Sequence, residues 1–401
     1  MSITSPPRTP IHPVQETPVE ETRSLHFPLD PLLTLAVLGL GLCSLLTLRA
    51  ATSHIVAGQP SYYVERQAVY LIVGVVAMGI LSQVDYSQAR QLQRGIYVLL
   101  LLSILAVLGA GHAARGSQRA IELPFFNFQA SELGKVLLIL SLAAFVVDRT
   151  RELRRAANTA RVVGAALVPA VLVIAQPDLG SGLVYVVIAL MLLFVAGAPW
   201  RHFAAIFALG AAVLALALIV APAAGVHVLK PYQVERLTAF LHPSKDPKKE
   251  GYQQEESKIA IGSGQKTGRG ANATQVPLNF VPESHTDFIF AAVGERYGFV
   301  GAALLLSLYA LLIWRALRVL TMARDTYGAL VAGGVVAMLM FQVFVNVGMA
   351  VGIMPITGVT LPLMSYGGSS VITTLLAVGL LQSIYVQARA SAANRGRVLR
   401  Y

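Results

Sequence analysis

Hydrophobic residues in this chain gather in ten long stretches, separated by shorter polar segments and by segments that contain glycine and proline. Most approach the roughly 20 residues that an α-helix needs to cross a bilayer. Backbone N–H and C=O groups in hydrocarbon must be paired within their own segment, so each stretch predicts a helix that extends into its flanks. The stretches are residues 31–48, 67–81, 95–111, 133–147, 162–175, 181–198, 203–221, 297–313, 327–351 and 370–386. The pattern predicts an all-α polytopic membrane protein with ten transmembrane helices.

The composition excludes most soluble protein classes. Of the 401 residues, 55% are hydrophobic and 13% are charged, and the charged share is roughly half that of an ordinary soluble domain. A mean hydropathy of +0.65 also argues against disorder. The single cysteine, Cys43, lies within the first apolar stretch, where a small buried hydrophobe is expected. An intrachain disulfide and a cysteine-based metal cluster are therefore excluded.

The placement of the charges predicts orientation. The chain has 31 Lys and Arg against 20 Asp and Glu, a net charge of +11. If the N-terminus is cytoplasmic, seventeen basic residues lie in inner segments and six in short outer loops and helix starts. Short loops with excess Lys and Arg face the cytoplasm. The bias predicts that both termini are cytoplasmic, and it explains the basic residues without any nucleic-acid partner.

The same pattern divides the chain into a core and two tails. Residues 1–30 lack the basic start and short apolar core of a signal peptide, and we expect a flexible cytoplasmic tail. Residues 31–389 form the membrane domain, and residues 390–401 a basic cytoplasmic tail. Residues 226–287 form one long extracytoplasmic loop before the eighth helix. A loop this long without a clear helix or strand pattern is expected to be functional.

Ionisable residues are mostly absent from the middle of the spans, where a pump or channel would need them. Polar Gln342 and Asn346 lie within a span and are explained by hydrogen bonding between helices. The unusual residues concentrate in segments predicted to face outward. This distribution favours chemistry at the outer membrane boundary.

One such segment is residues 129–135. Ser131 is placed to cap the following helix, and Glu132 and Lys135 share a helical face because they are three residues apart. A surface ion pair is the alternative interpretation of these two charges. Residues 176–180 contain a Pro-Asp turn between two spans, which is typical of ordinary chain reversal.

Asp287 ends the long loop and directly precedes three apolar residues, Phe288, Ile289 and Phe290. Partial desolvation at this boundary would raise the basicity of its carboxylate. A helix N-cap is an equally good explanation of an aspartate at this position. A cation site with His285 would need further ligands. The glycine-containing residues 262–270 match neither common phosphate-binding glycine motif.

Residues 354–370 carry two prolines and paired glycines between two spans. This composition predicts an irregular re-entrant segment, which membrane depth allows only where protein or water covers the backbone. We expect it to line a cavity.

Four of these segments, in this order, resemble the SEDS family (shape, elongation, division and sporulation) of polytopic bacterial peptidoglycan glycosyltransferases. The resemblance extends over residues 31–389, and the sequences at 229–233, 236, 240–247 and 251–253 look more like the RodA elongation branch than the FtsW division branch. The motifs are QASELGK at 129–135, QPDLG at 176–180, PESHTDFIF at 282–290 and LPLMSYGGSS at 361–370.

The resemblance implies polymerisation of lipid II, a disaccharide-pentapeptide on undecaprenyl pyrophosphate, at the outer face of the cytoplasmic membrane for elongation and cell shape. It implies that Asp287 is the catalytic base of an inverting transfer. It implies that Arg66, Arg119 and Lys135 neutralise the pyrophosphate, and it leaves room there for a divalent cation, Mg²⁺ or Mn²⁺. The residues implied to orient groups or hold the loop are Glu132, Arg236, Glu283 and His285.

The chain departs from the family pattern at two places. Ala120 stands where the family usually has Trp, and Ala130 stands where it usually has Pro. The resemblance further implies a partner of the class B penicillin-binding type, a transpeptidase that crosslinks the strands.

Three alternatives stay open. A lipid II flippase would also use ten spans and cationic pyrophosphate contacts, but it should carry polar groups along the whole transbilayer path. A scaffold with an inert loop would need no catalytic acid. The third alternative is the septal member of the same family, which serves division.

Overall fold

The computed structural model describes residues 29–53, 55, 59–110, 120–122, 127–220, 236, 250–276, 278, 280–281 and 283–398. Most of the predicted N-terminal tail and much of the long loop lie outside these residues. The described helices are α1 Pro31–Thr52, α2 Tyr62–Gln83, α3 Gln88–Gln91, α4 Gln93–Ala110, α5 Ala130–Val147, α6 Ala156–Ala175, α7 Leu179–Val195, α8 Trp200–Ala215, α11 Glu250–Ser263, α12 Ile289–Met322, α13 Thr326–Val351 and α14 Gly368–Val398. Short turns of other helix types cover Thr150–Glu152, Leu216–Val220 and Gly270–Asn272.

Each predicted apolar stretch overlaps one helix. Among the described residues, eight helices are long and apolar enough to cross a membrane, and two more apolar helices, Gln93–Gly109 and Leu179–Val195, are shorter. The prediction of a mostly helical polytopic membrane fold is confirmed. It missed one small hairpin, in which β1 Ile121–Glu122 pairs antiparallel with β2 Asn127–Phe128.

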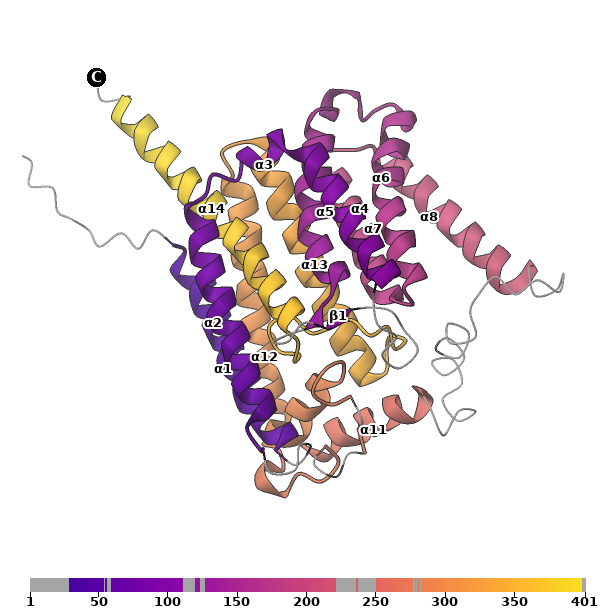
Figure 1. Cartoon of the computed structure of the whole chain (residues 1–401), viewed down its shortest axis with the longest axis vertical. Helices are drawn as coiled ribbons and strands as arrows, with labels where there is room; N and C mark the ends of the chain where they lie inside the picture. Colours follow the sequence, from indigo (N-terminus) through magenta and orange to yellow (C-terminus); the bar gives the residue numbers. More distant parts are fainter. Residues whose placement is uncertain are drawn as a thin grey trace, which may run out of the picture.

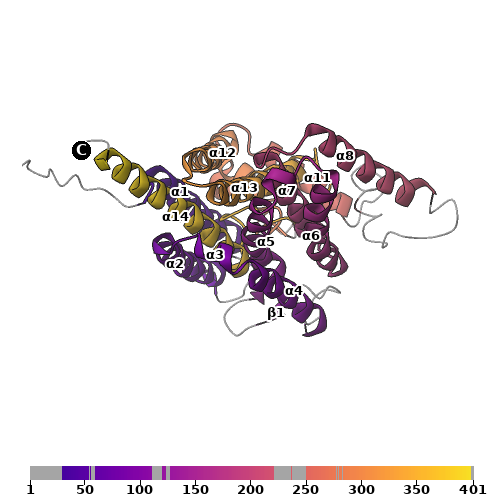
Figure 2. The same cartoon turned by 90° about the horizontal axis from the view of Figure 1, so that it is seen from above.

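The spanning helices run side by side, with α5 and α13 near the middle and α8 at the edge (Figures 1 and 2). In the apolar windows of α5, α13 and α14, 78% of residues are buried, against 22% in α2 and none in α8. Most apolar side chains of α8, and those on one side of α2, therefore face outward, as expected for helix faces that meet lipid, while Tyr70 and Met78 of α2 are buried.

The long loop contains a helix that the sequence pattern missed, α11, which lies across one end of the bundle (Figure 1). Gln254 Nε2 donates to Met349 O (3.2 Å) and Met354 O (2.8 Å), and Ser257 Oγ donates to Ala350 O (2.8 Å). The Ser257 bond satisfies the carbonyl of Ala350 in the last turn of α13. The Gln254 bonds give Met349 O a second donor beside Gly352 N and reach Met354 O just beyond the helix. These hydrogen bonds and the packing of Ala260 and Ile261 against the core hold α11 in place.

The glycines that follow α11 allow the chain to lie directly on α12. Gly298 interrupts α12 with φ of 64°, and a Cβ atom there would lie 2.3 Å from the nitrogen of Gly268. A Cβ atom at Gly264 would lie 1.9 Å from the carbonyl oxygen of Gly294. Only residues without side chains permit so close an approach of two backbones.

Candidate active site

Asp287 lies at the end of a short hydrogen-bonded turn that leads into α12. The backbone N–H groups of Thr286 and Phe288 donate to Glu283 O at 3.2 and 3.0 Å. Thr286 Oγ1 donates to Glu283 Oε2 at 2.9 Å. The N-cap of α12 is Phe288, so the capping alternative for Asp287 is wrong by one position. Asp287 is half-buried just outside an apolar helix end.

The backbone of Asp287 is fixed by α13. Asn346 Nδ2 donates to Asp287 O and to Val359 O, each at 2.8 Å. On the side-chain side, a Cβ atom at Gly358 would lie 3.6 Å from Asp287 Oδ2. The carboxylate therefore faces the irregular segment between α13 and α14. Hydrogen bonding between helices, our sequence-based explanation of Asn346, is wrong because the amide holds two loop carbonyls instead.

Several hydrogen bonds from neighbouring segments hold the irregular segment, as expected for non-helical backbone at membrane depth. Leu361 N donates to Ser365 Oγ (2.8 Å), Tyr309 Oη donates to Pro362 O (2.5 Å), and Ser44 Oγ donates to Met364 O (2.9 Å). Leu363 takes φ of 63°, a conformation that costs a residue with a side chain about 1–2 kcal/mol. Strained backbone held by its surroundings is frequent at functional sites.

His285 and Arg66 meet around a group of tyrosines. The His285 ring lies 5.0 Å from that of Tyr63, which lies 4.9 Å from that of Tyr366. Tyr366 N donates to His285 O at 2.9 Å. The Arg66 guanidinium stacks over Tyr62, 4.5 Å from its ring centroid.

The positive charge of Arg66 also acts on the Tyr366 hydroxyl. The structure thus places Arg66 and His285 around one tyrosine of the irregular segment.

Glu132 and Lys135 form an ion pair at the start of α5. Lys135 Nζ lies 2.5 Å from Glu132 Oε1, and only 2% and 5% of the two side chains are exposed. The alternative of a surface ion pair is wrong, because both charges are removed from water. Burying a pair of charges is expensive unless the geometry is close, as it is here.

Asp178 joins the first two motifs. Ser131 Oγ donates to Asp178 Oδ2 at 2.9 Å, and Asp178 Oδ1 accepts from Ser181 N at 3.1 Å to cap α7. The N-cap of α5 is Gln129, so the capping role predicted for Ser131 is wrong. The Pro-Asp turn is thus also a connection between α5 and α7.

Both motifs reach the irregular segment. A Cβ atom at Gly180 would lie 2.8 Å from Thr357 O, and Gln129 N donates to Ser369 Oγ at 3.0 Å. Because Gly358 is beside the Asp287 carboxylate, the four motif segments form one continuous group of contacts.

The remaining predicted site residues are Arg119, Arg236 and Glu283. Arg119 lies outside the described residues, and Arg236 is a half-buried position whose neighbours in sequence also lie outside them. Glu283 binds Thr286 within the turn of Asp287. Across the described ranges, no three His, Cys, Asp or Glu side chains gather closely enough to hold a metal ion, and we assign no step to one.

Two buried residues that support this region were missed by sequence reasoning. Gln67 Nε2 donates to Ser44 Oγ (3.1 Å) and Ser365 O (3.3 Å). Glu295 accepts from the backbone N–H groups of residues 274, 275 and 276 at 2.7, 2.8 and 2.9 Å. The sequence did contain a signal for each. Gln67 is a polar residue at the start of a predicted span, and Glu295 is an acid just before another.

The comparisons with known proteins agree with this grouping. The family model described as "Cell cycle protein" (FTSW_RODA_SPOVE) matches residues 29–390. The peptidoglycan glycosyltransferase MrdB of Escherichia coli strain K12 is 37% identical over 358 residues, which cover 89% of this chain and 93% of MrdB. The probable peptidoglycan glycosyltransferase FtsW of Thioalkalivibrio sulfidiphilus is 37% identical over 372 residues, 91% of this chain and 90% of that protein.

A solved structure described as "structural coordination of polymerization and crosslinking by a peptidoglycan synthase complex" contains a similar chain. The two chains are 32% identical, superpose with a TM-score of 0.72, and match over 90% of this chain and 98% of the other. This chain therefore belongs to the family of FtsW, RodA and SpoVE, the SEDS family that its motifs resemble, and is a multi-pass protein of the bacterial cytoplasmic membrane.

Proposed function

We propose that this chain is a peptidoglycan glycosyltransferase that polymerises lipid II into glycan strands at the outer face of the cytoplasmic membrane. The observation that carries the proposal is the half-buried Asp287 carboxylate, held at an apolar helix end beside the irregular segment where the four motifs meet. Relatives that match nearly the whole chain are named peptidoglycan glycosyltransferases.

In the proposed reaction, Asp287 accepts the proton of the acceptor sugar's 4-hydroxyl group. The hydroxyl oxygen bonds to the anomeric carbon of the donor as the bond from that carbon to the pyrophosphate oxygen breaks. The anomeric configuration inverts, and the bonding electrons leave with the undecaprenyl pyrophosphate. One carboxylate base suffices, because a pyrophosphate leaves readily once its charge is balanced.

Arg66, Arg119 and Lys135 supply the balancing charge in this proposal. Of the two that the structure describes, Arg66 is better placed than Lys135, since its tyrosine contacts hold it beside the irregular segment. Lys135 has Glu132 as its partner, so it contacts the pyrophosphate only by sharing or exchanging that partner. Glu132, Arg236, Glu283 and His285 are proposed to orient these groups.

The orientation is also part of the proposal. Ten helices cross the membrane, both termini are cytoplasmic, and residues 226–287 form the extracytoplasmic catalytic loop. The excess of Lys and Arg in the short loops on the other side supports this arrangement. The partner is a class B penicillin-binding transpeptidase, a proposal supported by the similar chain in a synthase complex that couples polymerization with crosslinking.

The test is Asp287→Asn, which keeps shape and removes the base. We expect strand synthesis from lipid II by the purified protein with its transpeptidase to fall at least about 10²-fold. Asp85→Asn, an equal change at an exposed acid that pairs with Arg324, is the matched control and should retain activity. Strand synthesis at the unmodified rate by Asp287→Asn would remove this residue from catalysis.

Further measurements separate the alternatives. Translocation of labelled lipid II in vesicles without chain growth would favour the flippase. Normal growth of cells that carry only Asp287→Ala would favour the scaffold. Imaging of a tagged copy at the side wall or at the septum distinguishes elongation from division.

A further inference from the structure

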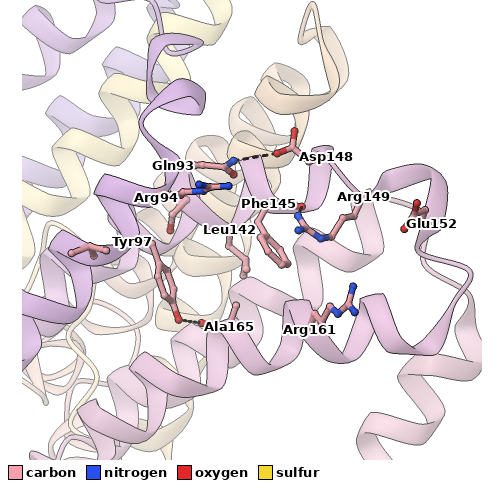
Figure 3. A pocket seen from close by; sticks show the side chains of 12 residues that line it. Gln93, Arg94, Tyr97, Leu142, Phe145, Asp148, Arg149, Glu152, Arg161 and Ala165 are labelled. Carbon is pink, nitrogen blue, oxygen red and sulfur yellow. Dashed lines mark hydrogen bonds between the residues drawn. The ribbon is translucent and has the colours of Figure 1, made fainter.

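A cavity of about 810 Å³ lies between the start of α4, the end of α5 and the start of α6 (Figure 3). Its size falls in the range of roughly 300–1,000 Å³ that is typical of small-molecule sites. The cavity is separate from the candidate active site. Ala130 begins α5 among the motif contacts, whereas the cavity lies at the Val147 end, and 18 helical residues rise roughly 27 Å.

The polar lining of this cavity is dominated by three arginines, Arg94, Arg149 and Arg161. Figure 3 shows Arg149 and Arg161 on one side of Phe145 and Arg94 on the other. Arg149 lies over the Phe145 ring, 3.7 Å from its centroid, which holds its guanidinium plane in place.

The two acids in the lining have other partners. Asp148 accepts from Arg90 Nη2 (2.9 Å) and Gln93 Nε2 (3.2 Å), and Glu152 accepts from Asn158 Nδ2 (3.0 Å). Within the described part of the chain, none of the three lining arginines lies within 4.0 Å of a carboxylate. The lining holds three arginines against two acids, and Arg90 outside the lining pairs with one of those acids, so the cavity keeps an excess of positive charge, which fits an anion.

The cavity continues into apolar surface. On α4, Val98, Leu102 and Leu105 are 52%, 58% and 45% exposed, and on α6, Leu167 and Val171 are 42% and 59% exposed. Tyr97 Oη donates to Ala165 O at 2.8 Å and links the two helices at the cavity (Figure 3). Both helices are apolar enough to lie in a bilayer. A ligand in the cavity would thus have the arginines around its polar end and the exposed apolar side chains of α4 and α6 along its other end.

We propose that this cavity binds an anionic phospholipid of the leaflet opposite the candidate active site. Arg149 and Arg161 bind the phosphate from one side of Phe145, because planar arginine donors match phosphate oxygens well, and Arg94 adds positive charge from the other side. The acyl chains follow the exposed faces of α4 and α6. The arginines also lie in two segments that the charge bias predicts to be cytoplasmic, Arg94 in one and Arg149 with Arg161 in the next, where the membrane surface carries anionic lipid.

Native mass spectrometry of the full-length protein in detergent tests the proposal with two probes, dioleoyl phosphatidylglycerol and dioleoyl phosphatidylcholine. We expect retained phosphatidylglycerol, weaker retention of phosphatidylcholine, and no displacement by equimolar glycerol 3-phosphate. The variant Arg94→Gln/Arg149→Gln/Arg161→Gln should weaken phosphatidylglycerol binding roughly tenfold or more. Equal retention of both lipids, or displacement by the soluble phosphate, overturns the proposal.

The matched control is Arg151→Gln/Arg154→Gln/Arg155→Gln, which removes the same charge from exposed positions of the same segment that do not line the cavity. We expect its affinity to change by less than about threefold. Equal losses in both triple variants would mean general charge attraction and no site. A second variant, Val98→Trp, fills the groove from an exposed position without altering charge, and unchanged binding by it also overturns the proposal.

Discussion

At the Ala130 end of α5, Lys135 and Glu132 lie 2.5 Å apart with 2% and 5% of their side chains exposed. At the Val147 end, Arg90 and Asp148 lie 2.9 Å apart with 48% and 36% exposed. The two pairs have similar distances and very different surroundings. Water screens the charges of Arg90 and Asp148, so each is stable without the other. Lys135 and Glu132 are shielded from water, so each charge needs its partner to offset the cost of burial. Burial, more than distance, identifies the ion pair that the fold must keep.

Removing one buried charge should have the largest effect on stability. Lys135→Met leaves Glu132 buried without its partner, and we expect the free energy of unfolding to fall by about 3–5 kcal/mol. Chemical denaturation in detergent measures the change. Adding Glu132→Gln should recover much of the loss, and a double variant as unstable as Lys135→Met would show that the charge itself is not the cause.

A smaller effect is expected from packing between the two charges. Gly134 lies between them, and a Cβ atom there would lie 2.0 Å from Tyr185 Oη and 2.8 Å from a methyl carbon of Leu100. Gly134→Ala should therefore destabilise the protein by about 1–3 kcal/mol. The control is Gly164→Ala on α6, where nothing lies within 4 Å, and it should leave stability unchanged or raise it by up to about 1 kcal/mol. Equal thermal shifts in the two variants would contradict the packing argument.

The smallest effect is expected at the exposed pair. A double-mutant cycle of Arg90→Ala and Asp148→Ala should give a coupling energy of about 0.2–1 kcal/mol. Burial alone would raise the pKa of Asp148, but hydrogen bonds from Arg90 and Gln93 outweigh it and hold the pKa below its usual value. The stabilisation is present above the unfolded pKa of about 3.9 and is lost as pH falls through the folded value. Coupling that survived below both pKa values would rule out this charge interaction.

Features whose partners are close in the sequence could be predicted, and features whose partners are distant could not. The spans and the pairing of Glu132 with Lys135 follow from local spacing, so the pattern was sufficient to find them. The cap assigned to Ser131 failed because Asp178, far away in the sequence, accepts its hydroxyl hydrogen. Asn346 and α11 were misassigned or missed for the same reason, since their partners are carbonyls of distant segments. The roles of Asp287, Arg66 and the other site residues remain predictions that the proposed experiments test.

The forked hydrogen bond of Asn346 has a mechanical consequence. Through its side-chain amide nitrogen, Asn346 of α13 donates hydrogen bonds to the carbonyl oxygens of both Asp287 and Val359. If a neighbouring protein tilts α13, the acid and the backbone wall opposite it move together. We therefore expect the spacing between the backbones of Asp287 and Val359 to change little when the bundle deforms.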